Sequence, residues 1–143
     1  VTRAITERFG AQRIDPQIAA DGTLPRELAR TRSLHYTTWT LTAAFDLATL
    51  GQCVGVDVFS HVGPQGQSLR SATDAVAAYS GRTSQWPWPE LNRDETIGLY
   101  EVLQRAAWIW NDRAYRDKAE VYDTTHADED LALRLATYSS PRG

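Results

Sequence analysis

Two arginines stand directly ahead of a tyrosine at the start of an almost uncharged stretch. Arg30 and Arg32 precede Ser33, and Tyr36 follows three residues after that serine. Free backbone N–H groups at a helix N-terminus attract anions, and arginine binds carboxylates in a bidentate manner. If Ser33 caps a helix, the cluster predicts a carboxylate or sulfate site. The alternative is that these arginines are solvated or paired with Glu27.

Tyr36 lies beside this predicted anion site, which makes it a candidate for proton transfer. An arginine about 5 Å from a phenolate favours the anion by roughly 3 kcal/mol at an effective dielectric of about 20. That magnitude permits a tyrosinate, although desolvation offsets part of it. The alternative is that Tyr36 only packs inside a buried helix.

Other residue types with chemical potential form weaker patterns. His35 lies about 100° around a helix from Tyr36, so we interpret it as a structural neighbour. His61 and His126 belong to different loops, and we predict no metal site. The run Trp86-Pro87-Trp88-Pro89 holds two rigid indoles. Their faces suit sugar rings, but such tryptophans also fill gaps between helices.

The bulk composition is that of one globular domain spanning residues 1–143. The chain is 42% hydrophobic and carries a net charge of −3, which argues against a nucleic-acid partner. Its single cysteine, Cys53, excludes an internal disulfide framework and is predicted to be buried. Residues 33–56 hold one formal charge, at Asp46, but their threonines make a poor membrane span.

Helical signals dominate, and the predicted fold class is all-α, built from antiparallel helical hairpins as in a bundle, solenoid or toroid. The helix that begins at Ser33 is apolar on two faces and is therefore predicted to lie inside the protein. One face holds Leu34, Leu41, Phe45 and Ala48, and the other holds Tyr36, Trp39, Ala43, Leu47 and Leu50. Helices are expected over 2–15, ending near Pro16, over 33–51, 68–79 and 92–111, with shorter ones over 115–122 and 130–138, a loop over 19–32 and a frayed tail over 139–143.

Several short motifs of the chain resemble those of a known family. The pattern Leu24-Pro25-x-Glu27-Leu28-x-Arg30-Thr31-x-Ser33-x-His35-Tyr36, with later Gly55-Val56-Asp57, Gly66-x-Ser68-Leu69 and Trp86-Pro87, resembles the C-terminal half of the alginate lyase family. The resemblance runs from near Ile5 to about Tyr115. It implies part of an (α/α) toroid that cleaves uronic-acid polysaccharides by β-elimination, without a cofactor, in the periplasm or outside the cell.

The resemblance also implies roles for individual residues. Tyr36 would take the C5 proton of the uronate and donate one to the departing 4-oxygen. Arg30, or Arg32 in its place, would lie near the tyrosine and the substrate carboxylate, where cations stabilise enolate charge. We assign substrate binding to Arg32, Glu27, Trp86 and Trp88.

One family feature is absent from this sequence. The asparagine–histidine pair that the family carries on an earlier helix does not occur in the 143 residues. The chain is therefore expected to be the later half of a toroid, exposing apolar helix faces that meet the missing half or another chain. The alternatives are a non-catalytic module that binds acidic glycans and a helical interaction scaffold.

Overall fold

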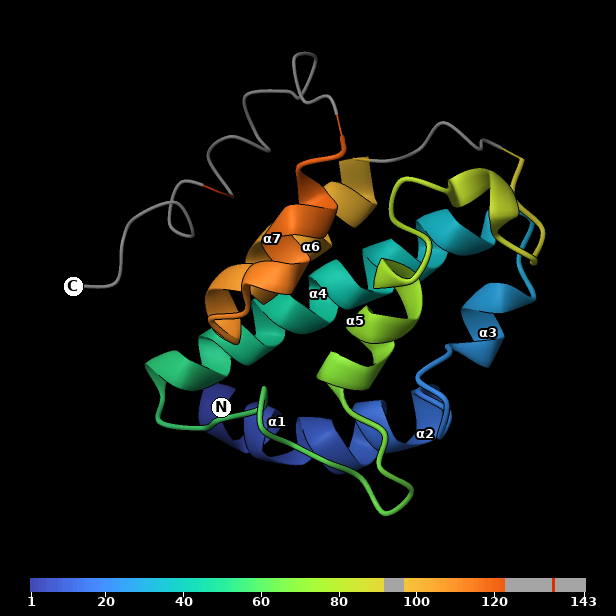
Figure 1. The fold of residues 1–143 in the computed structure, drawn as a ribbon. Helices are drawn as coiled ribbons and strands as arrows, with labels where there is room; N and C mark the ends of the chain where they lie inside the picture. Colours follow the sequence, from blue (N-terminus) through green and yellow to red (C-terminus); the bar gives the residue numbers. More distant parts are fainter. Residues whose placement is uncertain (92–96, 123–134, 136–143) are drawn as a thin grey trace.

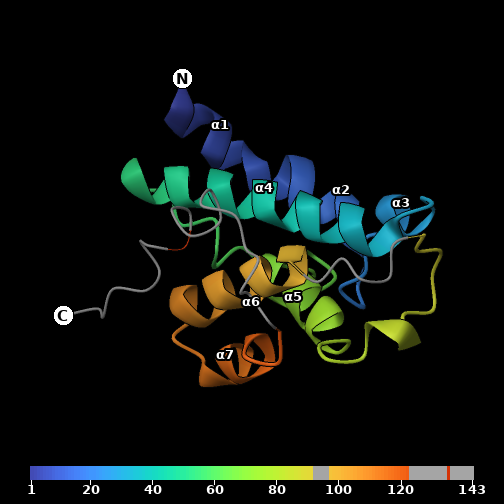
Figure 2. The same cartoon turned by 90° about the horizontal axis from the view of Figure 1, so that it is seen from above.

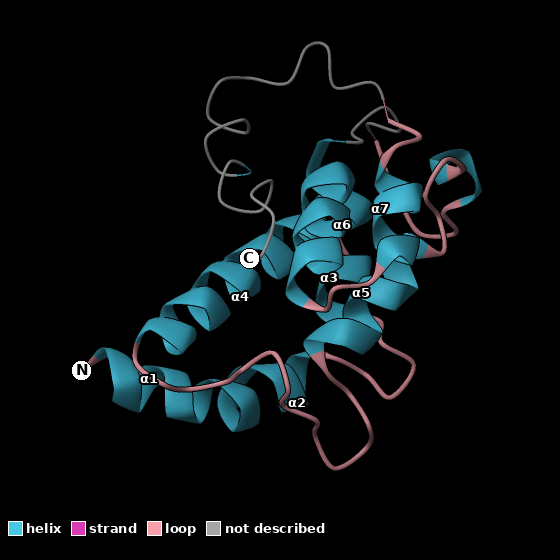
Figure 3. Ribbon diagram, turned by 60° about the vertical axis from the view of Figure 1, so that its left-hand side comes forward, coloured by secondary structure: helices cyan, strands magenta, loops and turns pink. Residues whose placement is uncertain are grey.

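The computed structural model describes residues 1–91, 97–122 and 135, and this part of the chain is helical, as predicted. It contains no strand within those residues, and one isolated antiparallel β-bridge joins Arg32 to Glu90. Helices connected by loops make up the architecture (Figure 1, Figure 3). Residues 92–96 of the helix expected over 92–111, the helix over 130–138, His126 and the tail over 139–143 lie outside the described residues, apart from Leu135.

Helix α4 (Ser33–Cys53) is the central element of the fold. It packs against α1 (Thr2–Phe9), α3 (Pro25–Leu28), α5 (Leu69–Ala77) and α6 (Ile97–Ile109). Figure 2 shows α4 between α1 and the pair α5 and α6, with α7 (Arg113–Ala119) beyond α6. Helices α1 and α4 run in opposite directions (Figure 1). The described helices include none that is both long and apolar enough to cross a membrane.

One predicted face of α4 forms the centre of the core. Leu34 and Leu41 are 1% exposed, and Phe45 and Ala48 are fully buried. Apolar side chains of α5 and α6 pack on this face because both helices present aliphatic residues at helical spacing. The core residues contributed by these two helices are Leu69, Ala72, Val76, Leu99, Val102, Leu103 and Ala106.

The second apolar face of α4 departs from the prediction that it is enclosed. Trp39 is 63% exposed and Leu50 is 51% exposed, while Ala43 is also exposed and Leu47 is half-buried. The N-terminal helix borders this face without covering it, so Trp39 and Leu50 stay exposed. Cys53 corrects another prediction: it is exposed at the end of α4, since the helix extends past Gly51 and carries the thiol away from the core.

The N-terminal helix is longer than predicted and contains a π-helical turn. Helix α1 continues through η1 (Gly10–Ile14) into α2 (Asp15–Gln17), so it does not end at the Asp15–Pro16 step. Proline lacks an N–H and crowds the preceding turn of a regular helix. The wider turn before Pro16, in which the Asp15 N–H donates to the Gly10 carbonyl, gives the ring room.

The remaining elements agree with the prediction apart from their bounds. The region 19–32 is not entirely loop, because Pro25 starts the short helix α3, where its fixed φ is compatible with a first helical position. Helix α5 begins after Ser68, whose side chain forms a capping box with Ser71. The short helix η2 (Thr83–Gln85) leads into the tryptophan–proline run.

Candidate active site

The start of α4 is held by a pairing with the segment that follows the tryptophan–proline run. The Ser33 N–H donates to the Pro89 carbonyl at 2.9 Å, and the Leu91 N–H donates to the Thr31 carbonyl at 3.1 Å. With the Arg32–Glu90 bridge, these bonds align residues 31–33 with residues 89–91. The residues that lead into α4 are therefore fixed against the segment after the tryptophan–proline run.

The free N–H groups at the helix start bind a carboxylate of the protein itself. Glu90 Oε2 accepts from the Leu34 N–H at 2.8 Å and from the His35 N–H at 3.2 Å. The Glu90 side chain is buried, with 8% exposure. The predicted anion site at this helix N-terminus therefore exists, but an internal carboxylate occupies it, which corrects the expectation of an external carboxylate or sulfate there.

Ser33 is the first helical residue and not the predicted N-cap. The N-cap position belongs to Arg32, which is half-buried and makes no side-chain capping bond. The Ser33 hydroxyl instead donates to the Pro89 carbonyl at 2.6 Å and accepts from Trp86 Nε1 at 2.7 Å. Because Glu90 satisfies the helix N–H groups, the serine hydroxyl is used to attach the tryptophan–proline run.

Arg30 and Tyr36 are brought into direct contact. The guanidinium carbon of Arg30 lies 3.3 Å from the centre of the Tyr36 ring. Glu27, one turn earlier on α3, approaches the guanidinium with Oε2 3.5 Å from Nη1. The Arg30 side chain is 48% exposed and Tyr36 is half-buried, so the pair is open to solvent. The sequence left two possibilities for the arginines, a position beside Tyr36 or an ion pair with Glu27. Arg30 makes both contacts.

An aromatic cluster surrounds Tyr36 on the exposed side of α4. The His35 ring lies edge-on to Tyr36 with centroids 5.1 Å apart, and Trp39 lies 6.0 Å from Tyr36. His35 also stacks on Trp39 at 6.3 Å. The prediction of His35 as a structural neighbour of Tyr36 fits this arrangement. Trp39, which had no predicted role in the site, offers the most exposed aromatic surface near the tyrosine.

The two tryptophans of the proline run differ in position. Trp86 is only 4% exposed and packs edge-on against Tyr79 at 4.9 Å and against Trp88 at 4.7 Å. Its burial favours the gap-filling alternative over contact with a sugar. Trp88 is half-buried and keeps some exposed surface.

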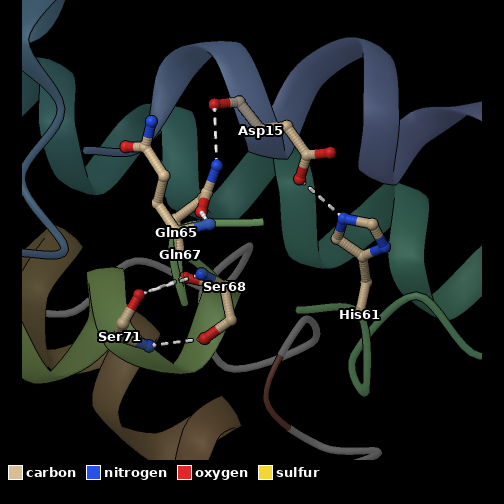
Figure 4. Close-up of polar contacts among 6 residues, drawn as sticks. All are labelled: Asp15, His61, Gln65, Gln67, Ser68 and Ser71. Carbon is tan, nitrogen blue, oxygen red and sulfur yellow. Dashed lines mark hydrogen bonds and ion pairs between the residues drawn. The ribbon is translucent and has the colours of Figure 1, made fainter. Parts of the chain in front are cut away.

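A second polar cluster attaches the loop over 54–67 to the N-terminal helix (Figure 4). His61 Nε2 lies 2.7 Å from Asp15 Oδ1, and the Gln67 amide donates to the Asp15 carbonyl at 3.2 Å. The imidazole packs against Gly10, where a Cβ would lie 2.4 Å from Nδ1. In residues 1–91, 97–122 and 135, no group of three histidine, cysteine or acidic side chains gathers as a metal site would require.

Glu90 is the site residue that the sequence did not reveal. It follows an aperiodic run of tryptophans and prolines and lies 56 positions after Leu34, so no local pattern links it to α4. The Asp15–His61 contact was missed for the same reason, because 46 positions separate the two residues. For the Glu90 contact, the sequence signal is a glutamate directly after the tryptophan–proline run.

The fold and the site together define the class of protein. An all-α chain with an arginine–tyrosine pair at the start of a central helix is similar in structure to an alginate lyase from Bacteroides ovatus, with a TM-score of 0.85 and 26% sequence identity. The alginate lyase family model matches residues 1–86, and the chain belongs to that family. The structural match covers 96% of this chain and 36% of the Bacteroides chain. A comparison with curated proteins found no match.

Proposed function

We propose that this chain carries the proton-transfer residues of a polysaccharide lyase that cleaves alginate or a related polyuronate by β-elimination. The observation that supports the proposal best is the contact of the Arg30 guanidinium with the Tyr36 ring in a chain of the alginate lyase family. The pair is accessible to a polymer, since Arg30 is half-exposed. It also combines a proton-transfer group with a cation, the two groups that elimination next to a carboxylate requires.

In the proposed elimination, Tyr36 acts first as the base and then as the acid. The phenolate of Tyr36 takes the C5 proton of the uronate, and the electron pair of the C–H bond forms the C4–C5 double bond. The C4–O bond breaks, and the departing oxygen receives a proton from the Tyr36 hydroxyl. Arg30 neutralises the carboxylate on C5, whose enolate character grows as the proton leaves.

The geometry of Arg30 suits the binding of a carboxylate. A guanidinium carries five N–H donors in its plane, and stacking on the Tyr36 ring uses its face. Glu27 approaches one end at 3.5 Å, and the half-exposed side chain keeps other donors available to a substrate carboxylate. Glu27 thereby orients the arginine, whereas Arg32, Trp39 and Trp88 are proposed to contact neighbouring sugars.

The chain covers about a third of the length of the Bacteroides enzyme, so a partner for its open face belongs to the proposal. A groove of about 380 Å³ lies between the N-terminal helix and α4, lined by Phe9, Arg13, Ala43 and Leu47 among others. Leu50 continues this apolar surface, with 51% exposure. We propose that further helices of the same enzyme, or another chain, pack on it. Because alginate is an extracellular polymer, we also propose a periplasmic or secreted location.

The alternative function is a module that binds acidic glycans without cleaving them. It is favoured by the arginine–aromatic site, which can bind a carboxylate without cleaving a bond. Such a module would need Arg30 and Trp39 but not the hydroxyl of Tyr36. The two functions therefore differ in their dependence on a single oxygen atom.

The deciding experiment uses the complete gene product that contains this sequence. Incubation with alginate and other polyuronates should release unsaturated uronate ends, detected by ultraviolet absorbance. Tyr36→Phe should abolish the release, and Tyr100→Phe, which removes a half-buried hydroxyl from α6, should not. Unchanged activity in Tyr36→Phe would contradict the assignment of Tyr36, while binding without product in the wild type would support the alternative.

A further inference from the structure

We propose that Glu90 is a positioning residue for the Arg30–Tyr36 pair, and this inference rests on the proposed lyase function. Glu90 belongs to the segment after the tryptophan–proline run, far from α4 in sequence, and its carboxylate contacts the first turn of α4. Its effect passes through the backbone of Leu34 and His35.

Glu90 acts on the backbone N–H groups at the start of α4. The first turn of an α-helix has N–H groups without intrahelical partners, and buried ones are costly unless another group accepts from them. Ser33 and Leu34 are both buried, with 0% and 1% exposure. The Pro89 carbonyl and the Glu90 carboxylate accept from the N–H groups of residues 33, 34 and 35. Residues 89 and 90 therefore provide the N-terminal cap that Arg32 does not.

This cap is linked to the catalytic pair. Tyr36 closes the first helical turn, since its N–H donates to the Arg32 carbonyl at 3.0 Å. Arg30 precedes the helix, and the chain bends between them at Arg32, whose φ is −125° and ψ is 62°. The distance from the guanidinium to the ring consequently depends on where the helix begins. If the first turn frays, Tyr36 moves relative to Arg30.

Glu90 also affects where the substrate carboxylate can bind. The helix N-terminus would be a competing site for that anion, because its N–H groups and dipole attract negative charge. Glu90 occupies the site from within the protein and is 8% exposed. The substrate carboxylate is therefore left to Arg30, beside the residue that takes the proton.

The structural arm of the test is a measurement of the pair itself in the complete gene product. Side-chain protons of Arg30 over the Tyr36 ring should show upfield ring-current shifts in NMR spectra of arginine-labelled protein. Glu90→Ala should move these resonances towards ordinary arginine values, and Glu90→Gln, which keeps one acceptor oxygen, should move them less. Asp112→Ala is the matched control, because it removes the side-chain cap of α7 at the Ala114 N–H, far along the chain from α4.

The kinetic arm separates positioning from general stability. Glu90→Ala should lower kcat by about tenfold to 100-fold with KM within about twofold, as expected when reacting groups are misplaced without loss of substrate contacts. Glu90→Gln should recover part of the loss, and Asp112→Ala should leave kcat unchanged. A raised KM with normal kcat would overturn the positioning role.

The two arms also separate this inference from the proposed function. If the wild type releases no unsaturated product, the lyase assignment fails, and the NMR shifts of Arg30 still decide whether Glu90 positions the pair. Unchanged Arg30 resonances in Glu90→Ala would overturn the inference even if the enzyme is active. Shifted resonances together with reduced kcat would support both.

Discussion

Arg30 stacks its guanidinium on the ring of Tyr36, with 3.3 Å between the guanidinium carbon and the ring centre. The arginine comes from the residues after α3 and the tyrosine from the first turn of α4, so their contact spans the junction between two helices. Such a stack holds the cation by its face and leaves its N–H groups at the edge. In the proposed function this pair binds the substrate carboxylate and moves a proton beside it.

The planar shape of Arg30 should matter as much as its charge. We expect Arg30→Ala to lower kcat on a polyuronate by about 100-fold to 1000-fold, comparable to the removal of one transition-state donor. Arg30→Lys should restore only a small part, because lysine neither stacks nor forms a bidentate pair. Steady-state kinetics of the complete gene product checks this. Lysine that performs as well as arginine would show that only the charge is needed.

The buried Arg105 should contribute strongly to stability. It is 2% exposed, with Nη2 2.7 Å from Asp46 Oδ1 and Nη1 3.5 Å from Glu101 Oε1, and it thereby joins α6 to α4. Arg105→Ala leaves the buried Glu101 without this cation, and we expect a loss of about 3–5 kcal/mol in the free energy of unfolding. Chemical denaturation measures it.

Asp46→Asn is the matched comparison for Arg105, since the Asp46 side chain is 61% exposed. An exposed partner is well solvated, so this substitution should cost less than about 1 kcal/mol. Equal losses for the two variants would mean that Asp46, and not burial of Glu101, dominates the network.

Gly10 should tolerate alanine poorly despite its helical position. Alanine favours helix over glycine by about 1 kcal/mol, but a Cβ here would lie 2.4 Å from the His61 ring. Because His61 is held by Asp15, we expect an overpacking cost of about 1–3 kcal/mol to outweigh the helix gain. Thermal or denaturant unfolding of Gly10→Ala should show the net loss.

The Gly10 prediction has an internal control in His61→Ala. In that background the ring is gone, so Gly10→Ala should become neutral or stabilising. If alanine at position 10 has the same effect with and without the imidazole, the contact with His61 is not the cause.

Stability should fall at alkaline pH through Tyr115. Burial, followed by the hydrogen bond to Asp74 at 2.5 Å, raises the pKa of this phenol above its ordinary value near 10, while Arg70 opposes the shift. The unfolded chain therefore loses the proton first, so the contribution is present below about pH 10 and is lost as the pH rises further. Tyr115→Phe should remove this slope, measured as the free energy of unfolding against pH.

The comparison variant for Tyr115 is Tyr100→Phe, which should keep the alkaline slope of the wild type. Tyr115→Phe should also cost about 1 kcal/mol near neutral pH through loss of the bond to Asp74. An unchanged slope in Tyr115→Phe would assign the alkaline loss to other groups.

The local pattern of the chain was sufficient to predict most of the helices and the closeness of the arginines to Tyr36. The spacing of Leu34, Leu41 and Phe45 predicted the buried face of α4, because helical periodicity acts over a few residues. The arginines and Tyr36 are close together in sequence, so their proximity in space could be predicted from the same local spacing. The family resemblance rested on this segment and on the short motifs at 55–57, 66–69 and 86–87, and it was confirmed by the match over residues 1–86.

Long-range packing settled the features that no short segment encodes. Glu90 reaches the Leu34 N–H across 56 positions, and this contact assigns the helix N-terminus to the protein and the substrate carboxylate to Arg30 in the proposed mechanism. Trp86, which bonds to the start of α4, is buried, whereas Trp39, which belongs to α4, is exposed. Their residue type predicts that large aromatic side chains tend to be buried, but which of them is buried depends on which other elements pack nearby.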